Sequence, residues 1–206
     1  MTKLVLIGAG GHSKVIQDIV AENRDIELYA IVDDAFTKTV KKEGIIQGNT
    51  SLLDTLQKEE FQYCLAIGNN RIRKKLFEKF CIPIEQYATL IHSSAVISKS
   101  AVVGNGTVIM PNVVVNGDSV IGNHSILNTG SVVEHDNVLG NYVHLSPNAT
   151  LAGTVSIYEG THIGAGAVVI PGMHIGRWSV IGAGGVVVAD VEDNVTVVGV
   201  PARKLK

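Results

Sequence analysis

The chain has 206 residues, of which 46% are hydrophobic and 17% charged, with 22 glycines and a formal net charge of −2. This composition excludes a disordered chain, and the charge gives no reason to expect a nucleic acid or a membrane as partner. Cys64 and Cys81 lack metal-binding spacing, and the apolar run at 4–7 is too short for a signal or membrane segment. We therefore expect a soluble, cytoplasmic protein without a disulfide framework.

The first part of the chain alternates strand-like and helix-like segments. Apolar runs predict strands and amphipathic patterns predict helices, in the order strand 4–7, helix 14–23, strand 28–32, helix 52–58, strand 63–67 and helix 72–80. This βαβαβα order predicts a short parallel sheet with right-handed crossovers, a Rossmann-like α/β domain over residues 1–87. Ligands of such sheets bind at the carboxyl ends of the strands, where the loops 8–13, 33–34 and 68–70 would meet.

A glycine-rich turn, Gly8–Ser13, follows the first strand. A full dinucleotide fingerprint would have glycine where Ser13 stands, and the domain is half the length of a dinucleotide-binding fold. Backbone N–H groups at the start of the following helix would favour a phosphate. The turn therefore favours a nucleotide sugar or nucleotide phosphate over NAD, and a tight turn without a ligand is the remaining interpretation.

The second part of the chain carries a repeat of six residues. An aliphatic residue recurs at every sixth position from Ile91 to Val187 without a break, and a small residue often follows four places later. This period predicts a left-handed parallel β-helix over residues 88–206, in which three hexapeptides form one triangular coil of 18 residues. The aliphatic residues would point inward, Gly and Asn would supply the positive φ angles of the corners, and the tail 195–203 would close the end.

His135 follows the inward-pointing Val133 by two residues, so it should lie on an edge of the prism. Its neighbours one coil away in either direction are Gly117 and Gly153. We expect open space on both sides of the imidazole and amide groups within reach of a ligand, as a general base beside an oxyanion site requires. An exposed surface histidine is the alternative interpretation.

The other histidines of the repeat differ in position. His144 is half a coil away from His135 and cannot share its edge, so the two would meet only across a subunit boundary, which favours a homotrimer with active sites between subunits. His162 should stack directly on His144, whereas His124 and His174 are expected on the surface.

Several motifs occur together along the chain. They are Gly8-x-Gly10-Gly11-His12-x-Lys14-Val15, Asp33-Asp34, the segment Ala66–Arg73, Glu134-His135-Asp136 and Gly199-Val200-Pro201-Ala202. In this combination the whole chain resembles the PglD/NeuD-type sugar acetyltransferases. The resemblance implies a trimeric enzyme that transfers an acetyl group from acetyl-CoA to the 4-amino group of a nucleotide-linked deoxyamino sugar. Some members of the family are described as sialic-acid O-acetyltransferases.

The resemblance also assigns roles to residues of this chain. His135 would be the general base and Asp136 the acid that tunes it, although the family often has Glu at this second position. Contacts with acetyl-CoA would come from His144, Gly153, Ala165 and Ala183. Contacts with the nucleotide sugar would come from Gly10, Gly11, His12, Asp33, Asp34, Gly68 and Asn69.

These roles predict direct transfer through a ternary complex, without an acetylated enzyme, because no residue is placed as a covalent nucleophile. The acceptor would be a UDP- or dTDP-linked amino sugar used in surface polysaccharide or glycan biosynthesis. Acetylation of sialic acid or another free sugar is one alternative, and a non-catalytic trimeric scaffold that binds nucleotide sugars is another. No metal is expected, since the histidine spacing differs from that of the zinc carbonic anhydrases that share the repeat.

Overall fold

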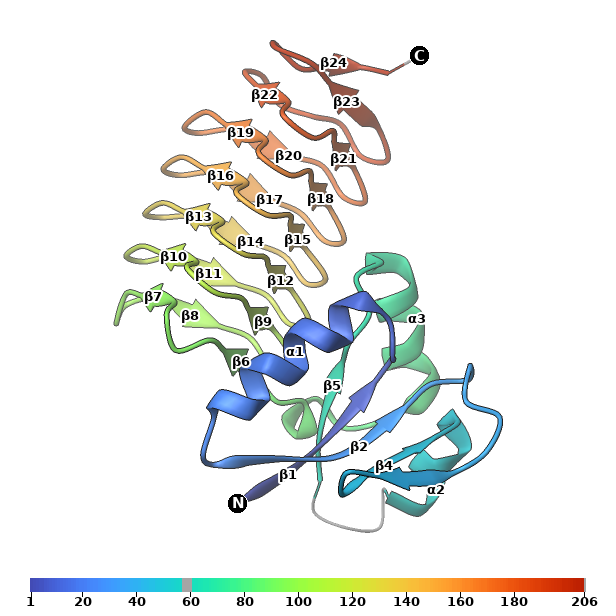
Figure 1. Cartoon of the computed structure of the whole chain (residues 1–206). Helices are drawn as coiled ribbons and strands as arrows, with labels where there is room; N and C mark the ends of the chain where they lie inside the picture. Colours follow the sequence, from blue (N-terminus) through green and yellow to red (C-terminus); the bar gives the residue numbers. More distant parts are fainter. Residues whose placement is uncertain (57–60, 206) are drawn as a thin grey trace. The chain divides into compact units, whose positions relative to one another are not determined.

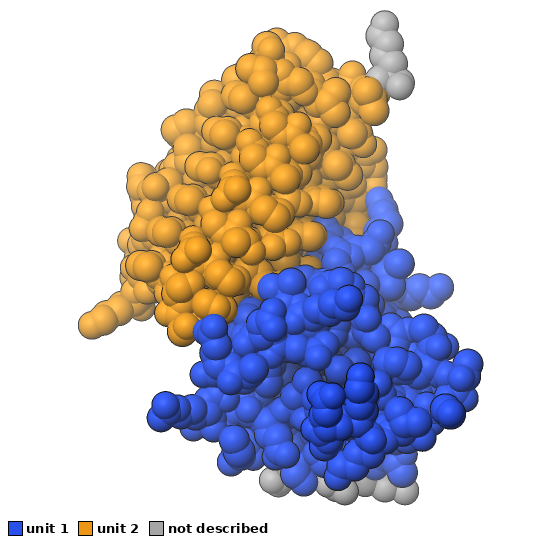
Figure 2. Space-filling view, viewed as in Figure 1, with its two compact units in different colours: residues 1–90 blue, residues 91–206 orange. Residues whose placement is uncertain are grey.

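The computed structural model describes residues 1–56 and 61–205. The chain divides into two compact units, Met1–Leu90 and Ile91–Lys206 (Figures 1 and 2). Within the described residues, no helix combines the length and the apolar character needed to cross a membrane.

The first unit is built on a five-stranded sheet with the order β3-β4-β2-β1-β5 (Figure 1). Its strands are β1 (Thr2–Ile7), β2 (Ile26–Val32), β3 (Val40–Lys42), β4 (Ile45–Gly48) and β5 (Gln62–Leu65). Its helices are α1 (Gly11–Glu22), the 3-10 turn η1 (Thr50–Leu52), α2 (Leu53–Leu56), α3 (Asn70–Phe80) and the 3-10 turn η2 (Ile84–Gln86). The three expected strands and the three expected helices are present; the predicted helical residues 57–58 lie outside the described residues.

One part of the sheet differs from the prediction of an all-parallel sheet. The strands β3 and β4 form an antiparallel hairpin, and β4 adds to the parallel sheet beside β2. The two turn residues, Glu43 and Gly44, have φ angles of 52° and 88°, as a type I′ hairpin turn requires. The sequence prediction missed this hairpin because β3 is exposed along its whole length, so it lacks an alternating apolar pattern, and Glu-Gly is a weaker turn signal than Asn-Gly.

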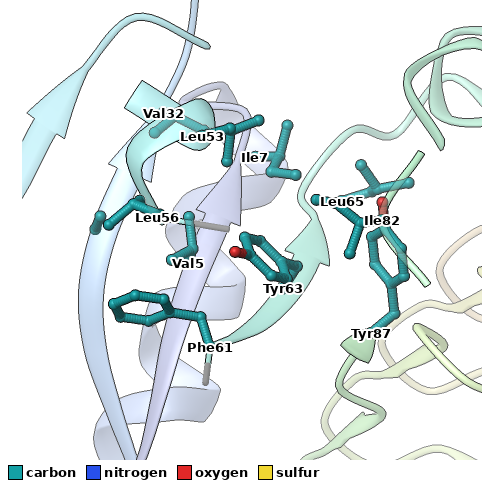
Figure 3. Packing of buried hydrophobic residues seen from close by; sticks show 11 residues of the cluster. Val5, Ile7, Val32, Leu53, Leu56, Phe61, Tyr63, Leu65, Ile82 and Tyr87 are labelled. Atoms are coloured by element: carbon teal, nitrogen blue, oxygen red, sulfur yellow. The ribbon is translucent and has the colours of Figure 1, made fainter. Parts of the chain in front are cut away.

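A core of aliphatic and aromatic side chains holds one face of this sheet (Figure 3). Val5 and Ile7 of β1 pack with Tyr63 of β5, and Leu53 of α2 covers them. These side chains are almost completely removed from solvent, and each contributes roughly 1.5–3 kcal/mol of burial free energy. The core thereby fixes the carboxyl ends of the strands, where the predicted ligand loops begin.

The second unit is a parallel β-helix of two-residue strands (Figure 1). One sheet contains β7 (Val96–Ile97), β10 (Val114–Val115), β13 (Val132–Val133), β16 (Thr150–Leu151), β19 (Val168–Val169) and β22 (Val186–Val187). A second contains β8 (Val102–Val103), β11 (Val120–Ile121), β14 (Val138–Leu139), β17 (Ser156–Ile157) and β20 (His174–Ile175). The third contains β6 (Leu90–Ile91), β9 (Val108–Ile109), β12 (Ile126–Leu127), β15 (His144–Leu145), β18 (His162–Ile163), β21 (Val180–Ile181), β23 (Thr196–Val198) and β24 (Arg203–Lys204).

The pairing register confirms the predicted coil of 18 residues. Val115 pairs with Val133, and Leu127 pairs with Leu145. The aliphatic residues point inward, and from Ile109 to Val187 they are almost completely buried. The end of the prism is closed as expected by the tail, because β23 adds to β21 and β24 returns antiparallel along β23.

The corners of the prism use a left-handed residue at every sixth position. Glycine and asparagine occupy several of these positions, as expected, and the φ angle of Asn112 is 58°. Other residue types adopt the same conformation, namely Asp118, His124, Asp136, Tyr142, Thr154 and Trp178. The prediction was too narrow, because the neighbouring coils hold a corner through backbone hydrogen bonds whatever side chain projects from it.

Candidate functional site

The strand β13 ends in a corner, residues 134–137, that carries His135 and Asp136; we call this segment the His135 corner. Hydrogen bonds to the adjacent coils fix its backbone. The Asp136 N–H donates to the carbonyl oxygen of Gly117 (2.9 Å), and the His135 carbonyl oxygen accepts from the Thr154 N–H (3.0 Å). Asp136 has a φ angle of 58°. This conformation turns its carboxylate back toward the imidazole of the preceding residue.

His135 and Asp136 form a close pair. Asp136 Oδ2 lies 2.7 Å from His135 Nδ1, so the Nδ1–H of the neutral ring can donate to the carboxylate and leave Nε2 as a proton acceptor. The hydrogen bond to Asp136 raises the pKa of His135, and the negative charges of Asp136 and Glu134 add to this effect. The two side chains are 62% and 55% exposed. The pair therefore combines accessibility to a substrate with increased basicity.

The expectation of open space on both sides of His135 is wrong on one side. The imidazole lies directly against Gly153, since a Cβ atom at Gly153 would be 2.7 Å from His135 Cε1 and 2.8 Å from Nε2. A Cβ at Gly117 would instead meet the hydroxyl of Ser100 at 3.4 Å. Any side chain larger than that of glycine at position 153 would therefore displace the imidazole. The amide N–H of Gly153 donates no hydrogen bond within the described residues.

A buried amide behind the pair was missed in the sequence prediction. Asn137 is completely buried, and its Nδ2 donates to the carbonyl oxygens of Glu134 (2.5 Å) and Ala152 (3.0 Å). Its Oδ1 accepts from the N–H of Val155 (2.8 Å). An amide at a corner position that the repeat usually gives to a small residue was the sequence signal that could have identified it.

His144 lies in β15, in a different sheet from β13, and therefore not on the edge that carries His135. Its ring is parallel to that of His162 within 3°, with 4.7 Å between the ring centres, which confirms the predicted stacking. His144 Nε2 is 3.3 Å from Asn128 Nδ2, and His162 Nε2 is 2.7 Å from the Ser146 hydroxyl. These contacts give both rings a defined orientation on one face of the prism.

The remaining residues expected to contact acetyl-CoA are divided between two edges of the prism. Gly153 shares the edge of His135, whereas Ala165 and Ala183 are exposed at the corners that follow β18 and β21. Ala165 and Ala183 occupy adjacent coils, and the carbonyl oxygen of Ala165 accepts from the N–H of Gly184 (2.8 Å). A single subunit thus presents these residues as two separate groups.

The two histidines expected on the surface differ. His174 is exposed, and its Nδ1 lies 3.5 Å from Asp190 Oδ1, as predicted. The prediction is wrong for His124, which is 1% exposed and stacks on Tyr142, with ring centres 5.4 Å apart. The reason is that Tyr142 lies 18 residues, or one coil, after His124, so that its aromatic ring covers the corner that carries His124.

In the first unit, the expected loops meet at the carboxyl edge of the sheet. The N–H of Ala9 in the glycine turn donates to Asp33 Oδ2 (2.8 Å). Asp34 accepts hydrogen bonds from the N–H and the hydroxyl of Thr50, and Lys79 lies 4.0 Å from it. Asp33 therefore stabilises the glycine turn, whereas Asp34 has Thr50 and Lys79 as its partners.

Three glycines expected to contact the substrate border open space. A Cβ at Gly10, Gly11 or Gly68 would meet no atom within 4 Å, so packing within the chain does not require glycine at these positions. Gly10 caps α1, whose first N–H groups are available to an anion. In the third loop, Asn69 Oδ1 caps α3 by accepting from the Ile72 N–H (3.0 Å).

Below these loops lies a buried positive charge. Arg73 is 1% exposed, and its Nη1 donates to the carbonyl oxygens of Ile67 (2.9 Å) and Gly68 (3.3 Å). Burial, together with the charge of Arg73, lowers the pKa of His12 to about 4, so this imidazole is neutral at physiological pH. Burial raises the pKa of Cys64 to about 12, which removes this thiol as a nucleophile.

The described residues contain no group of three or more histidine, cysteine or acidic side chains that could hold a metal ion. The described residues offer an exposed histidine base with an acidic partner and, in the first unit, a loop edge suited to an anion.

Comparisons with known proteins agree on both units. The family model "PglD N-terminal domain" matches residues 3–80, and "Bacterial transferase hexapeptide (six repeats)" matches residues 100–135. A curated relative, UDP-N-acetylbacillosamine N-acetyltransferase of Bacillus subtilis (strain 168), is 44% identical over 112 residues. That alignment covers 53% of this chain and 52% of the relative, so it spans about half the length of each.

Solved structures match along all or nearly all of the chain, among them two complexes with CoA or acetyl coenzyme A. PerB from Caulobacter crescentus, in complex with CoA and GDP-perosamine, is 39% identical with a TM-score of 0.90, and the match covers 100% of this chain and 98% of that one. The acetyltransferase domain of PglB from Neisseria gonorrhoeae FA1090, in complex with acetyl coenzyme A, is 38% identical with a TM-score of 0.90 and 98% coverage of both chains.

Proposed function

Since this chain belongs to the PglD-type family of acetyl-CoA-dependent sugar acetyltransferases, we propose that it transfers the acetyl group of acetyl-CoA to the 4-amino group of a nucleotide-linked deoxyamino sugar. The observation that carries the proposal is the His135–Asp136 pair, an accessible histidine whose basicity is raised by a carboxylate 2.7 Å away. Such a pair is suited to removing a proton from an amine as the amine attacks a thioester.

The proposed reaction is a direct transfer. The sugar amine, as the free base, attacks the thioester carbonyl while Nε2 of His135 accepts the proton that nitrogen loses. Asp136 stabilises the resulting imidazolium through Nδ1–H. The N–H of Gly153, the residue against which the imidazole lies, donates no hydrogen bond within the described residues and is our candidate for stabilising the oxyanion. Collapse of the tetrahedral intermediate expels coenzyme A as the thiolate, which takes up a proton, and leaves an amide.

No covalent acetyl-enzyme is part of this mechanism. Cys64 is completely buried with a raised pKa, and Cys81 ends α3 in the first unit. Both cysteines belong to the first unit, so neither is part of the coils of the β-helix. Direct transfer requires that acceptor and acetyl-CoA are bound together, so we propose ternary-complex kinetics. Accumulation of an acetylated enzyme in the absence of acceptor would contradict this part of the proposal.

We assign the binding of the nucleotide part of the acceptor to the first unit. Gly10, Gly11 and Gly68 border open space at the carboxyl edge of the sheet, and the start of α1 favours a phosphate. His12, Asp33, Asp34 and Asn69 are the proposed polar contacts. The neutral state of His12 lets its ring both donate and accept a hydrogen bond.

We propose that the active protein is a homotrimer with active sites between subunits. His135 and His144 lie on different sides of the prism, and Gly153 and Ala183 lie on different edges. One molecule of acetyl-CoA can contact both groups if two subunits contribute to each site. Light scattering on the purified protein should give the mass of three chains, and a monomeric active enzyme would contradict this assignment.

The proposed function is tested by mixing the protein with acetyl-CoA and UDP-, dTDP- and GDP-linked 4-amino sugars and measuring thiol release. UDP and dTDP follow from the sequence-based expectation, and GDP is the nucleotide of the sugar bound to PerB. Release with one of them, accompanied by an N-acetylated product and lost in His135→Ala, is the expected result. Release only with free sialic acid would favour O-acetylation, and no release with any acceptor would favour a non-catalytic binding role.

A further inference from the structure

The fourth residue after each inward aliphatic residue lies where a polar side chain can form hydrogen bonds with the next coil. At most of these positions that carry a hydroxyl, the hydroxyl donates to a carbonyl oxygen of the next coil. Ser131 is the exception, because its buried hydroxyl has no hydrogen-bond partner within the described residues. Ser119 donates to Glu134 (2.8 Å) and Thr161 donates to Gly176 (2.5 Å). The same hydroxyl oxygen can accept a hydrogen bond from the backbone, as Ser119 does from the N–H of Asn137 (3.3 Å). The side chain of Ser119 thus links its coil to the next by two hydrogen bonds.

Asn137 performs both of these tasks and one more. Its Nδ2 donates to Ala152 in the next coil, and its Oδ1 accepts from the N–H of Val155, which reproduces the serine pattern. The second proton of its Nδ2 goes to the carbonyl oxygen of Glu134, three residues earlier in the same coil. This third hydrogen bond links the last residue of the His135 corner to its first. A serine at position 137 could not form it, because its hydroxyl has a single proton, which would bond to the next coil.

In the His135 corner this contact adds to the backbone hydrogen bonds with the adjacent coils. The side chain of His135 is 62% exposed, so surrounding side chains do little to hold the imidazole, and its position depends on the backbone of residues 134–136. Asp136 has a positive φ angle, a conformation that is unfavourable for a residue with a Cβ atom. The carbonyl oxygen of Glu134, in the peptide that leads to His135, accepts hydrogen bonds from the Ser119 hydroxyl and from Nδ2 of Asn137.

We propose that Asn137 is a positioning residue of the acetyl transfer, whose hydrogen bond to the Glu134 carbonyl oxygen holds the imidazole of His135 in line with the carboxylate of Asp136. The proposal rests on the proposed function in that His135 is taken as the base. It separates two roles of one side chain, because the contacts with Ala152 and Val155 stabilise the β-helix, whereas the contact with Glu134 orients the base.

Two substitutions distinguish these roles. Asn137→Ser retains the pair of inter-coil hydrogen bonds in the geometry of Ser119 and loses the contact with Glu134, whereas Asn137→Ala loses all three. We expect Asn137→Ser to melt close to the wild type and Asn137→Ala to melt at a clearly lower temperature. Both should lower kcat by a factor of about 10 to 100 with KM for acetyl-CoA within about twofold, because a displacement of about 1 Å at the reacting groups has this effect.

The matched control is Thr161→Val, which removes a buried inter-coil hydrogen bond at a different edge of the prism. It should lower the melting temperature and leave kcat unchanged. A second readout is the titration of His135 by NMR without substrate. In both Asn137 variants the pKa should move down toward that of an ordinary histidine as the contact with Asp136 loosens, and in Thr161→Val it should not move.

The result that would overturn the proposal is an Asn137→Ser protein with wild-type kcat and wild-type titration of His135. The proposal would also be overturned if kcat decreased in proportion to the melting temperature in Asn137→Ser, Asn137→Ala and Thr161→Val, because Asn137 would then have only a structural role. The NMR titration needs no acceptor, so it decides about Asn137 even if the wild-type protein acetylates none of the sugars tested.

Discussion

The substitution Gly153→Ala tests the geometry of the base most sharply. The backbone of Gly153 is not left-handed, so alanine fits its conformation without strain. The added methyl carbon would lie 2.7 Å from His135 Cε1 and 2.8 Å from Nε2. Carbon atoms in ordinary contact are about 3.5 Å apart, so the imidazole must move by about 0.8 Å or more. The ring is exposed and can move, at the expense of its 2.7 Å hydrogen bond with Asp136.

We therefore expect Gly153→Ala to fold normally and to lose kcat by a factor of about 10 to 100. The assay is thiol release under saturating acetyl-CoA and acceptor, together with the melting temperature. Gly117→Ala is the matched control, because Gly117 occupies the same edge one coil earlier and its Cβ would meet only ordinary contacts, with the hydroxyls of Ser100 and Ser98 at 3.4 and 3.8 Å. Wild-type kcat in Gly153→Ala, or an equal loss in Gly117→Ala, would refute the reasoning.

Three further variants test separate parts of the account. In Asp136→Asn the pKa of His135 should fall toward its ordinary value, because the hydrogen bond to Asp136 is the largest cause of the increase. The acid limb of the pH profile of kcat/KM should then move to lower pH. An unmoved limb would show that Asp136 does not set the pKa of His135. The pKa of His12 in the folded chain is about 4, against 6.5 in the unfolded chain, so the unfolded state binds more protons in this interval and stability should decrease as the pH falls from 6.5 to 4. The loss amounts to about 3 kcal/mol at most; urea unfolding of His12→Asn should not show it, and the same loss in this variant would contradict the assignment. Leu145→Ala should lower the free energy of unfolding by about 2–5 kcal/mol, because Leu145 is completely buried in the prism; a change below 1 kcal/mol would argue against a continuous core.

The β-helix could be predicted from the sequence because every coil repeats the same physical requirement. Ile109, Leu127 and Leu145 occupy one interior column, and each must be aliphatic for the coils to stack. The sheet of the first unit was predictable only where its strands are buried. The hairpin of β3 and β4 has no apolar alternation, and what places it is tertiary pairing with β2.

The candidate site was predictable in position and only partly in geometry. Spacing located His135 between two glycines, but the side to which an exposed ring turns depends on its partner, and Asp136 brings it against Gly153. Spacing also located the column of His124 without indicating that Tyr142 would cover its ring. The part played by Asn137 depends on where its two amide protons point, and a residue type alone does not determine this.

The most direct test of the central claim is the rate at which the wild-type protein and His135→Ala form an N-acetylated nucleotide sugar from acetyl-CoA, with the product identified by mass spectrometry. Positioned general bases contribute a factor of about 10² to 10⁴. The account predicts an amide product with the wild type and a loss of rate in this range with His135→Ala, while the variant remains folded. An N-acetylated product formed equally fast by His135→Ala, or none formed by the wild type with any nucleotide-linked amino sugar, would contradict it.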